Sequence, residues 1–196
     1  SGKISTTNTS LGVNSLAPTT SRNRNTVIGA EAMYLNTASD DNTAVGYQAL
    51  RAGSGARNVA IGNNTLQNTT GGDNTAVGMQ SLQSNTTGYN NVAVGRSSLY
   101  SNTSGYNNSA FGMQSLQSNT TGNNNVAVGR SSLYSNTSGY NNSAFGMQSL
   151  QSNTTGNNNV AVGRISLYQN TTGYNNSAFG TQSLQSNTTG NNNVAV

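Results

Sequence analysis

The 196-residue sequence has no cysteine, no histidine and no tryptophan, and it has a single proline. Without cysteine the chain forms neither disulfides nor thiolate metal sites. Only four side chains are acidic, and none lies beyond residue 73: Glu31, Asp40, Asp41 and Asp73. The groups that most often serve as general base, nucleophile or metal ligand are therefore absent or scarce. We predict that the chain is not an enzyme and uses no cofactor.

Long apolar runs are also missing. No stretch approaches the ~20 residues of a membrane helix, and no signal peptide is visible, so we expect no membrane insertion. Leu, Ile, Val and Phe make up only about 16% of the chain, below the ~20% floor of ordinary globular domains. Disordered chains share this low value but carry high net charge, whereas here the formal net charge is +4. The polarity comes from Asn, Ser, Thr and Gly, which suits either a flexible linker or a regular β-solenoid.

What the sequence does contain is a repeat. The block 91–124 recurs unchanged at 125–158 and with four changes at 159–192, and each block consists of two similar 17-residue halves. Three columns define the unit, shown here for three consecutive copies: Asn91, Gly95 and Leu99; Asn108, Gly112 and Leu116; Asn125, Gly129 and Leu133. We divide the chain into a lead-in (1–7), diverged 16–17-residue units (8–90) and near-identical double units (91–196). Because it opens on Ser1 and stops within a repeat, we expect a piece of a longer protein.

The composition of the unit favours strands over helices. A 34-residue period also fits helical hairpins, but the many Gly, Asn, Ser and Thr disfavour helix. The segment N-V-A-V-G alternates with period 2 and predicts a short strand, and the Ser-x-Leu-x segment after Gly predicts a second one. N-T-T-G then predicts a turn in which Gly supplies positive φ. We therefore predict an all-β parallel β-solenoid of about eleven coils, stacked at ~4.8 Å into a rod roughly 50 Å long.

Strand alternation predicts which side chains lie inside. Val92 and Val94 share one face, and Asn91 and Ala93 share the other; the small face suits the interior, although the reverse assignment stays open. An apolar stripe is then free for an interface: Val94, Phe111, Val128, Phe145, Val162 and Phe179. About three buried apolar side chains per coil make a thin core, so we expect a homo-oligomer.

At these residues the sequence resembles known proteins. NTAVGYQAL (42–50), NVAIGNNTL (58–66) and NVAVGRSSL (91–99) resemble the head repeats of trimeric autotransporter adhesins. They are still more similar to the NTAVGYxAL…NTTG arrays of phage tail fibres. The adhesin resemblance implies a left-handed parallel β-roll packed as a trimer. The unit here is longer, with N-T-T-G added to the turn. The resemblance therefore supports the expectation of a trimer better than it supports a particular coil shape or handedness.

The Asn columns have two interpretations. Amides hydrogen-bond sugar hydroxyls well, but a residue that recurs in every coil most simply forms an amide ladder along the stack, and we favour the ladder. The many N-x-S/T matches, such as Asn85-Thr-Thr, follow from composition and say little about glycosylation. Glu31, Asp40 and Asp41 are candidates for a local cation site, although a surface loop explains them more simply.

Alternation along the predicted second strand places Arg96, Ser98 and Tyr100 on one outward face. The resulting two-coil columns are candidates for contact with an anionic surface glycan: Arg96, Arg130 and Arg164, with Tyr100, Tyr134 and Tyr168. A second tyrosine set lies at the turns: Tyr106, Tyr140 and Tyr174. A simpler explanation is that these side chains are exposed to solvent and keep the fibre soluble without binding a ligand. Eight scattered cations make no concentrated patch, so we expect no nucleic-acid binding.

We predict a structural rod, most simply a homotrimer, that forms the shaft or head of an extracellular fibre on a virion or a cell surface. A phage or phage-like tail fibre involved in host attachment comes first. A bacterial trimeric adhesin or another surface filament comes next. From a different class, a monomeric solenoid that binds glycan or ice is the alternative, but it requires a flat Thr-x-Thr face, and here Thr gathers in turns.

Overall fold

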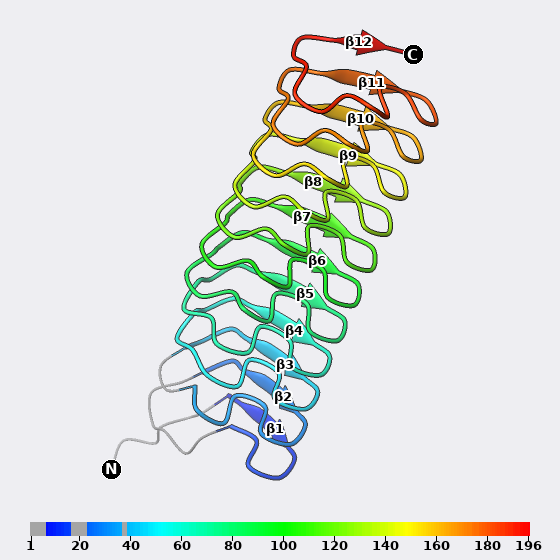
Figure 1. Cartoon of the computed structure of the whole chain (residues 1–196). Helices are drawn as coiled ribbons and strands as arrows, with labels where there is room; N and C mark the ends of the chain where they lie inside the picture. Colours follow the sequence, from blue (N-terminus) through cyan, green and yellow to red (C-terminus); the bar gives the residue numbers. More distant parts are fainter. Residues whose placement is uncertain (1–6, 17–22, 37–38) are drawn as a thin grey trace, which may run out of the picture.

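The computed structural model describes residues 7–16, 23–36 and 39–196, and within these ranges the chain forms twelve short strands and no helix (Figure 1). The strands are β1 Thr9–Leu11, β2 Thr26–Ile28, β3 Thr43–Val45, β4 Val59–Ile61, β5 Thr75–Val77, β6 Val92–Val94, β7 Ser109–Phe111, β8 Val126–Val128, β9 Ser143–Phe145, β10 Val160–Val162, β11 Ser177–Phe179 and β12 Val194–Ala195. They form one parallel sheet in sequence order. The chain is a parallel β-solenoid of about eleven turns, which confirms the predicted fold class. Most of the predicted lead-in (1–7) lies outside the described residues.

The coils stack into a rod with β1 and β12 at opposite tips (Figure 1). Equivalent repeat residues pair directly, as in Ala93↔Ala110 and Val94↔Phe111 between β6 and β7. The two 16-residue units keep this register, since Thr43 pairs with Val59 and Val59 with Thr75. Their missing residue falls in the turn before the next Asn, where a shorter loop leaves the sheet unchanged.

Each complete strand ends at a glycine that no other residue can replace without strain. Gly95, for example, has φ +135°, a conformation that side chains rarely adopt. A Cβ at this position would lie 2.6 Å from the carbonyl oxygen of Gly112 in the next coil. The same arrangement recurs from coil to coil, so the invariant Gly of the repeat is fixed by both backbone conformation and stacking distance.

The predicted second strand is wrong, because the segment after Gly is a series of turns. Ser97 and Leu99 are left-handed, with φ 54° and 49°, so the backbone curls instead of extending. It still bonds to both neighbouring coils: the Ser97 N–H donates to the Met79 carbonyl (3.0 Å), and the Leu99 N–H donates to the Ser115 carbonyl (3.0 Å). The segment therefore satisfies its backbone between coils, as a strand would, without strand geometry.

The core is narrow and partly polar. Ala93 and Leu99 are fully buried, and the same two positions are fully buried in each later coil up to Ala161 and Leu167, whereas the prediction was about three apolar side chains per coil. Earlier coils do hold three, as with Ala44, Ala49 and Leu50. In later coils a buried serine takes the place of Ala49, and its hydroxyl donates back to the strand-end glycine, as Ser98 does to the Gly95 carbonyl at 2.9 Å.

Candidate binding surfaces along the rod

The Asn column of the repeat lies inside the rod. Asn108 is fully buried, and its backbone N–H and Nδ2 both donate to Oδ1 of Asn91, at 3.0 and 3.1 Å. Nδ2 also donates to the Gly122 carbonyl across the turn (2.8 Å). The same bonds repeat from coil to coil, so these amides form a continuous ladder and are not exposed to a sugar.

A second Asn ladder runs through the turns, and sequence reasoning missed it. Asn119 is buried, and its Nδ2 donates to Oδ1 of Asn102 (2.8 Å) and to the Gly122 carbonyl (3.0 Å). The recurring Asn of N-T-T-G could have indicated this ladder, but Asn is also a common turn residue, and we predicted only turn hydrogen bonds for it. Asn85 belongs to this ladder and is fully buried, so the N-x-T match there is inaccessible to glycosylation in the folded chain.

The turn glycines are selected by space and not by positive φ, which corrects the prediction. Gly122 is absent from the left-handed residues. A Cβ on it would lie 2.5 Å from the Gly139 carbonyl oxygen of the next coil and would also overlap Oδ1 of Asn119. The left-handed residue of the turn is instead the first Asn of each Asn-Asn pair, such as Asn124 (φ 55°), and Asn tolerates this conformation better than most residues.

The carboxylates of the N-terminal coils are engaged with arginines or backbone. Arg24 pairs with Asp41 (Nε–Oδ1 2.5 Å), Arg57 with Asp73 (2.6 Å), and Arg51 with Glu31 (3.2 Å). The remaining carboxylate, Asp40, accepts the Asn23 backbone N–H at 2.8 Å. No cluster of three potential metal ligands occurs in the described ranges, so the acids suggested for a cation site serve pairing between coils.

Two of these pairs shift the ionisation of their members. The hydrogen bond from Arg24 lowers the pKa of Asp41, and the hydrogen bond from Arg57 lowers the pKa of Asp73. Both pairs are exposed, so salt screens them and they contribute little to stability. The four residues of these two pairs occupy equivalent positions in consecutive coils, and from Asn90 onward this position is Asn. The paired charges therefore belong to the diverged part of the rod.

The outer sheet face carries the predicted apolar stripe. Ala93 between Val92 and Val94 points inward and is fully buried, which places the small face inside. The third strand position is apolar in all eleven complete strands, and many of these side chains are exposed: Leu11 70%, Ile28 41%, Ile61 39%, Phe111 41%, Val128 36%, Phe145 42%, Val162 36% and Phe179 43%. We call the column formed by the third position of these strands, which includes Val94, the sheet-face stripe.

The predicted common face of Arg96, Ser98 and Tyr100 is wrong, because the backbone there is not extended. Arg96 is exposed at the tip of the loop after the strand, Ser98 is buried, and Tyr100 is half-buried. Tyr100, Tyr134 and Tyr168 alternate along their column with glutamines. The Oε1 atoms of the intervening Gln117 and Gln151 are buried without a hydrogen-bond partner. The tyrosines of this column are therefore half-buried, whereas the three arginines are exposed.

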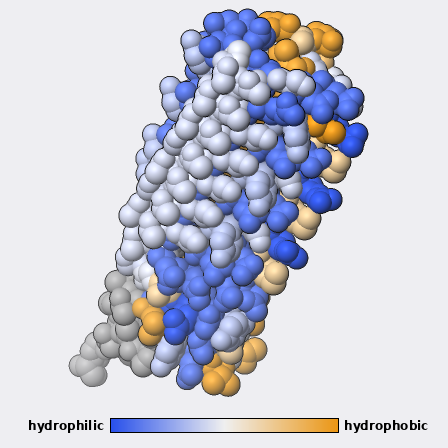
Figure 2. All heavy atoms as spheres, in the orientation of Figure 1, coloured by the Kyte–Doolittle hydropathy of each residue, from blue (hydrophilic) through white to orange (hydrophobic). Residues whose placement is uncertain are grey.

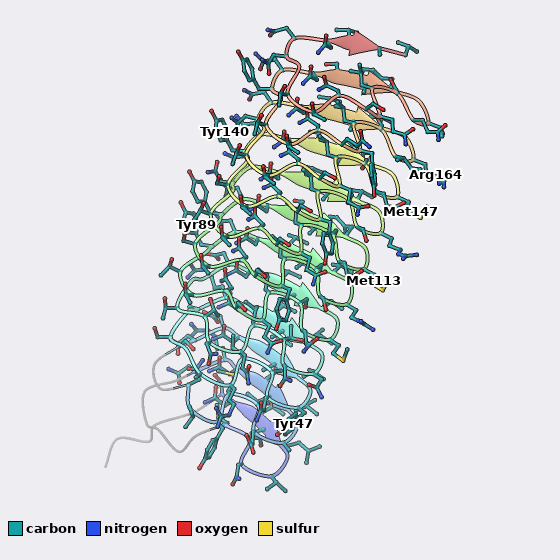
Figure 3. The ribbon with its side chains drawn as sticks, in the orientation of Figure 1. Tyr47, Tyr89, Met113, Tyr140, Met147 and Arg164 are labelled. Carbon is teal, nitrogen blue, oxygen red and sulfur yellow. The ribbon has the colours of Figure 1, made fainter. Side chains whose placement is uncertain are left out.

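Two edges of the rod differ in chemistry (Figure 3). One edge carries the loop tips, where Met113, Met147 and Arg164 project outward. The opposite edge carries the turn tyrosines Tyr89 and Tyr140. Adjacent coils allow ring stacking on that edge, since Tyr89 and Tyr106 lie 5.1 Å apart and nearly parallel. The later turn tyrosines alternate with Asn, so each stands alone.

Threonine also forms a column, with one member in every coil from Thr86 to Thr188. Its hydroxyls are used internally: Thr103 Oγ1 donates to the Thr120 carbonyl (3.0 Å), and Thr120 Oγ1 donates to the Thr137 carbonyl (3.0 Å). Figure 2 shows a pale face of intermediate hydropathy along the rod. Because these hydroxyl protons serve the stack, the column does not favour an ice-binding face.

Comparison of the chain with protein-family models, curated proteins and solved structures gave no match. No helix in the described ranges is long and apolar enough to cross a membrane. The part of the chain that the structure describes has no pocket.

Proposed function

We propose that the protein is a structural rod that associates with copies of itself to form the shaft or head of an extracellular fibre. Its interior consists of ladders that hold equal coils together, and this arrangement sets length and stiffness. The longer repeat with N-T-T-G favours a phage or phage-like tail fibre involved in host-surface attachment. A bacterial trimeric adhesin or another surface filament is the second candidate.

The observation that carries the proposal is the sheet-face stripe. Stacked at ~4.8 Å, the strands form a face roughly 50 Å long and about 10 Å wide, or about 500 Å². The largest apolar patch on a soluble protein is often functional, and here the apolar third strand positions form a column along the whole face. A second copy is the occupant that fits, because an identical rod presents the same repeat distance along its whole length. The number three comes from the resemblance to trimeric adhesin heads and tail-fibre arrays.

Sedimentation equilibrium of the 196-residue chain tests this proposal. The chain mass is 20.1 kDa, and we expect a species of three times that mass, which remains over a wide dilution range. A stable monomer with full β-type circular dichroism would contradict self-association while leaving the solenoid intact.

A further inference from the structure

The charges of this chain are divided sharply along its length. Every acidic residue lies at or before Asp73, and in the described ranges three arginines there are paired with acids. Beyond residue 73 the chain has no acid and three cations: Arg96, Arg130 and Arg164. These three have no ion-pair partner, so the C-terminal 123 residues carry an uncompensated charge of +3.

The three arginines lie in one column on one edge of the rod. Each follows a strand-end glycine and is exposed at the tip of its loop. They recur every second coil, which spaces them at about 9.6 Å and makes the column about 19 Å long. Figure 2 shows hydrophilic and apolar groups alternating along this edge, and Figure 3 shows Arg164 there with Met147 and Met113.

The groups between the arginines are suited to a sugar chain. Met113 and Met147 stand in the alternate coils of the column, and each offers a flexible apolar side chain that can adapt to the apolar parts of a ligand. Gln114 and Gln148 follow them and are partly exposed, so their amides are available to hydroxyls. A guanidinium binds a carboxylate or sulfate with two parallel hydrogen bonds.

We propose that the column Arg96–Arg130–Arg164 binds a linear acidic polysaccharide that carries one anionic group on every second sugar. Two sugars of an extended chain span about the distance between successive arginines. A nucleic acid fits less well, because its strands carry a phosphate about every 3.4 Å and single strands are bound by stacking on exposed aromatic rings. The column lies past the end of the strands, so copies joined through the sheet face leave it accessible at the rim.

This inference rests on the proposed role in surface attachment, for which it names the ligand class. The test measures binding of the full chain to immobilised hyaluronan, which has one carboxylate per two sugars, to polygalacturonate, which has one per sugar, and to uncharged dextran. We expect hyaluronan to bind best, dextran not at all, and the binding to weaken with salt. The variant R96Q/R130Q/R164Q should bind hyaluronan at least about tenfold more weakly, from three exposed charge contacts.

A matched control is present in the same chain. R24Q/R51Q/R57Q lowers the net charge by the same amount but removes arginines that are already paired, so it should keep hyaluronan binding. Equal losses in the two triple variants, no binding to any polyanion, or tighter binding to single-stranded DNA would each overturn the inference. Sedimentation of the same samples separates the two proposals: a trimer that ignores hyaluronan refutes the arginine column alone, and a monomer that binds it refutes self-association alone.

Discussion

Gly129→Ala is expected to destabilise the solenoid by about 2–6 kcal/mol, from backbone strain and overpacking together. Gly129 ends β8 with φ +129°, where a side chain is strained. Its Cβ would also lie 2.6 Å from the Gly146 carbonyl oxygen and 3.0 Å from the Met147 backbone nitrogen. Backbone on the next coil cannot move aside without breaking its own ladder bonds. Thermal and denaturant unfolding followed by circular dichroism measures the loss.

The position of the damage is also predicted. Coils contact only their neighbours, so the effect should spread outward from the substituted coil and fade with distance. Hydrogen exchange should show the fastest new exchange in β8 and β9, with β3 unchanged. Ser138→Ala, at an exposed turn position in the same repeat, is the control and should leave the melting temperature unchanged. A Gly129→Ala protein that melts like the wild type would refute the close stacking described here.

Asn125→Asp is expected to cost about 3 kcal/mol or more at neutral pH, because two buried acceptors lose their donor. Nδ2 of Asn125 donates to Oδ1 of Asn108 (3.1 Å) and to the Gly139 carbonyl (2.8 Å). Oδ1 accepts the N–H and Nδ2 of Asn142, at 3.0 and 3.1 Å. A carboxylate still accepts the two hydrogen bonds from Asn142. Its second oxygen replaces Nδ2, however, and places negative charge against Oδ1 of Asn108 and the Gly139 carbonyl oxygen.

The sign of the pH dependence follows from that arrangement. Burial and the facing acceptors disfavour the charged form, so the pKa of Asp at position 125 lies above its unfolded value of about 3.9. The variant is therefore closest to wild type below pH 3.9 and loses stability as the pH rises through the raised folded-state pKa. Asn123→Asp, outside the ladders, should show no such dependence. A deficit relative to wild type that is the same at pH 3 and pH 7 would contradict a buried ladder.

The columns of identical residues made most of the fold predictable. Asn, Ala, Gly and Leu recur at fixed spacing, and only a stack of equal coils gives each of them one environment. The period-2 alternation of N-V-A-V-G also separated the face of Ala93 from the face of Val94, and burial in the structure decides that Ala93 is the one inside. Register followed even through the 16-residue units, because the strand columns on either side continue unchanged.

The period-2 alternation gave a wrong prediction for the segment after the strand-end glycine, where the backbone is not extended. Leu99 is a branched apolar residue at φ 49°, a conformation that costs about 1–2 kcal/mol for an L-residue. Propensity gives no reason to expect it. Burial of the side chain holds it there, together with the bond from its N–H to the Ser115 carbonyl of the next coil and the bond that its carbonyl accepts from the Asn102 N–H. The same curl turned Ser98 inward and separated Arg96 from Tyr100. The repeated Asn-Asn pair was a usable signal, since one member is left-handed and the other is in the ladder.

The sequence predicted which residues form columns along the rod, but not which of those residues are paired with one another. The sheet-face stripe and the arginine column follow from the repeat alone, whereas pairing of Arg24, Arg51 and Arg57 required the stacked geometry. That pairing is what distinguishes the three later arginines from the earlier ones.

The proposed association of copies of the rod through the sheet face is tested most directly by the distances between labels on different copies. Because the chain has no cysteine, a single Ser→Cys substitution gives one defined spin-label site per copy. Ser143 lies on the sheet face in β9, and Ser138 lies on the exposed turn near Tyr140. Packed sheets lie about 10 Å apart, so dipolar spectroscopy should give short distances between copies for labels at residue 143 and clearly longer ones for labels at residue 138. Longer distances at 143 than at 138, or no coupling at either site, would contradict the claim.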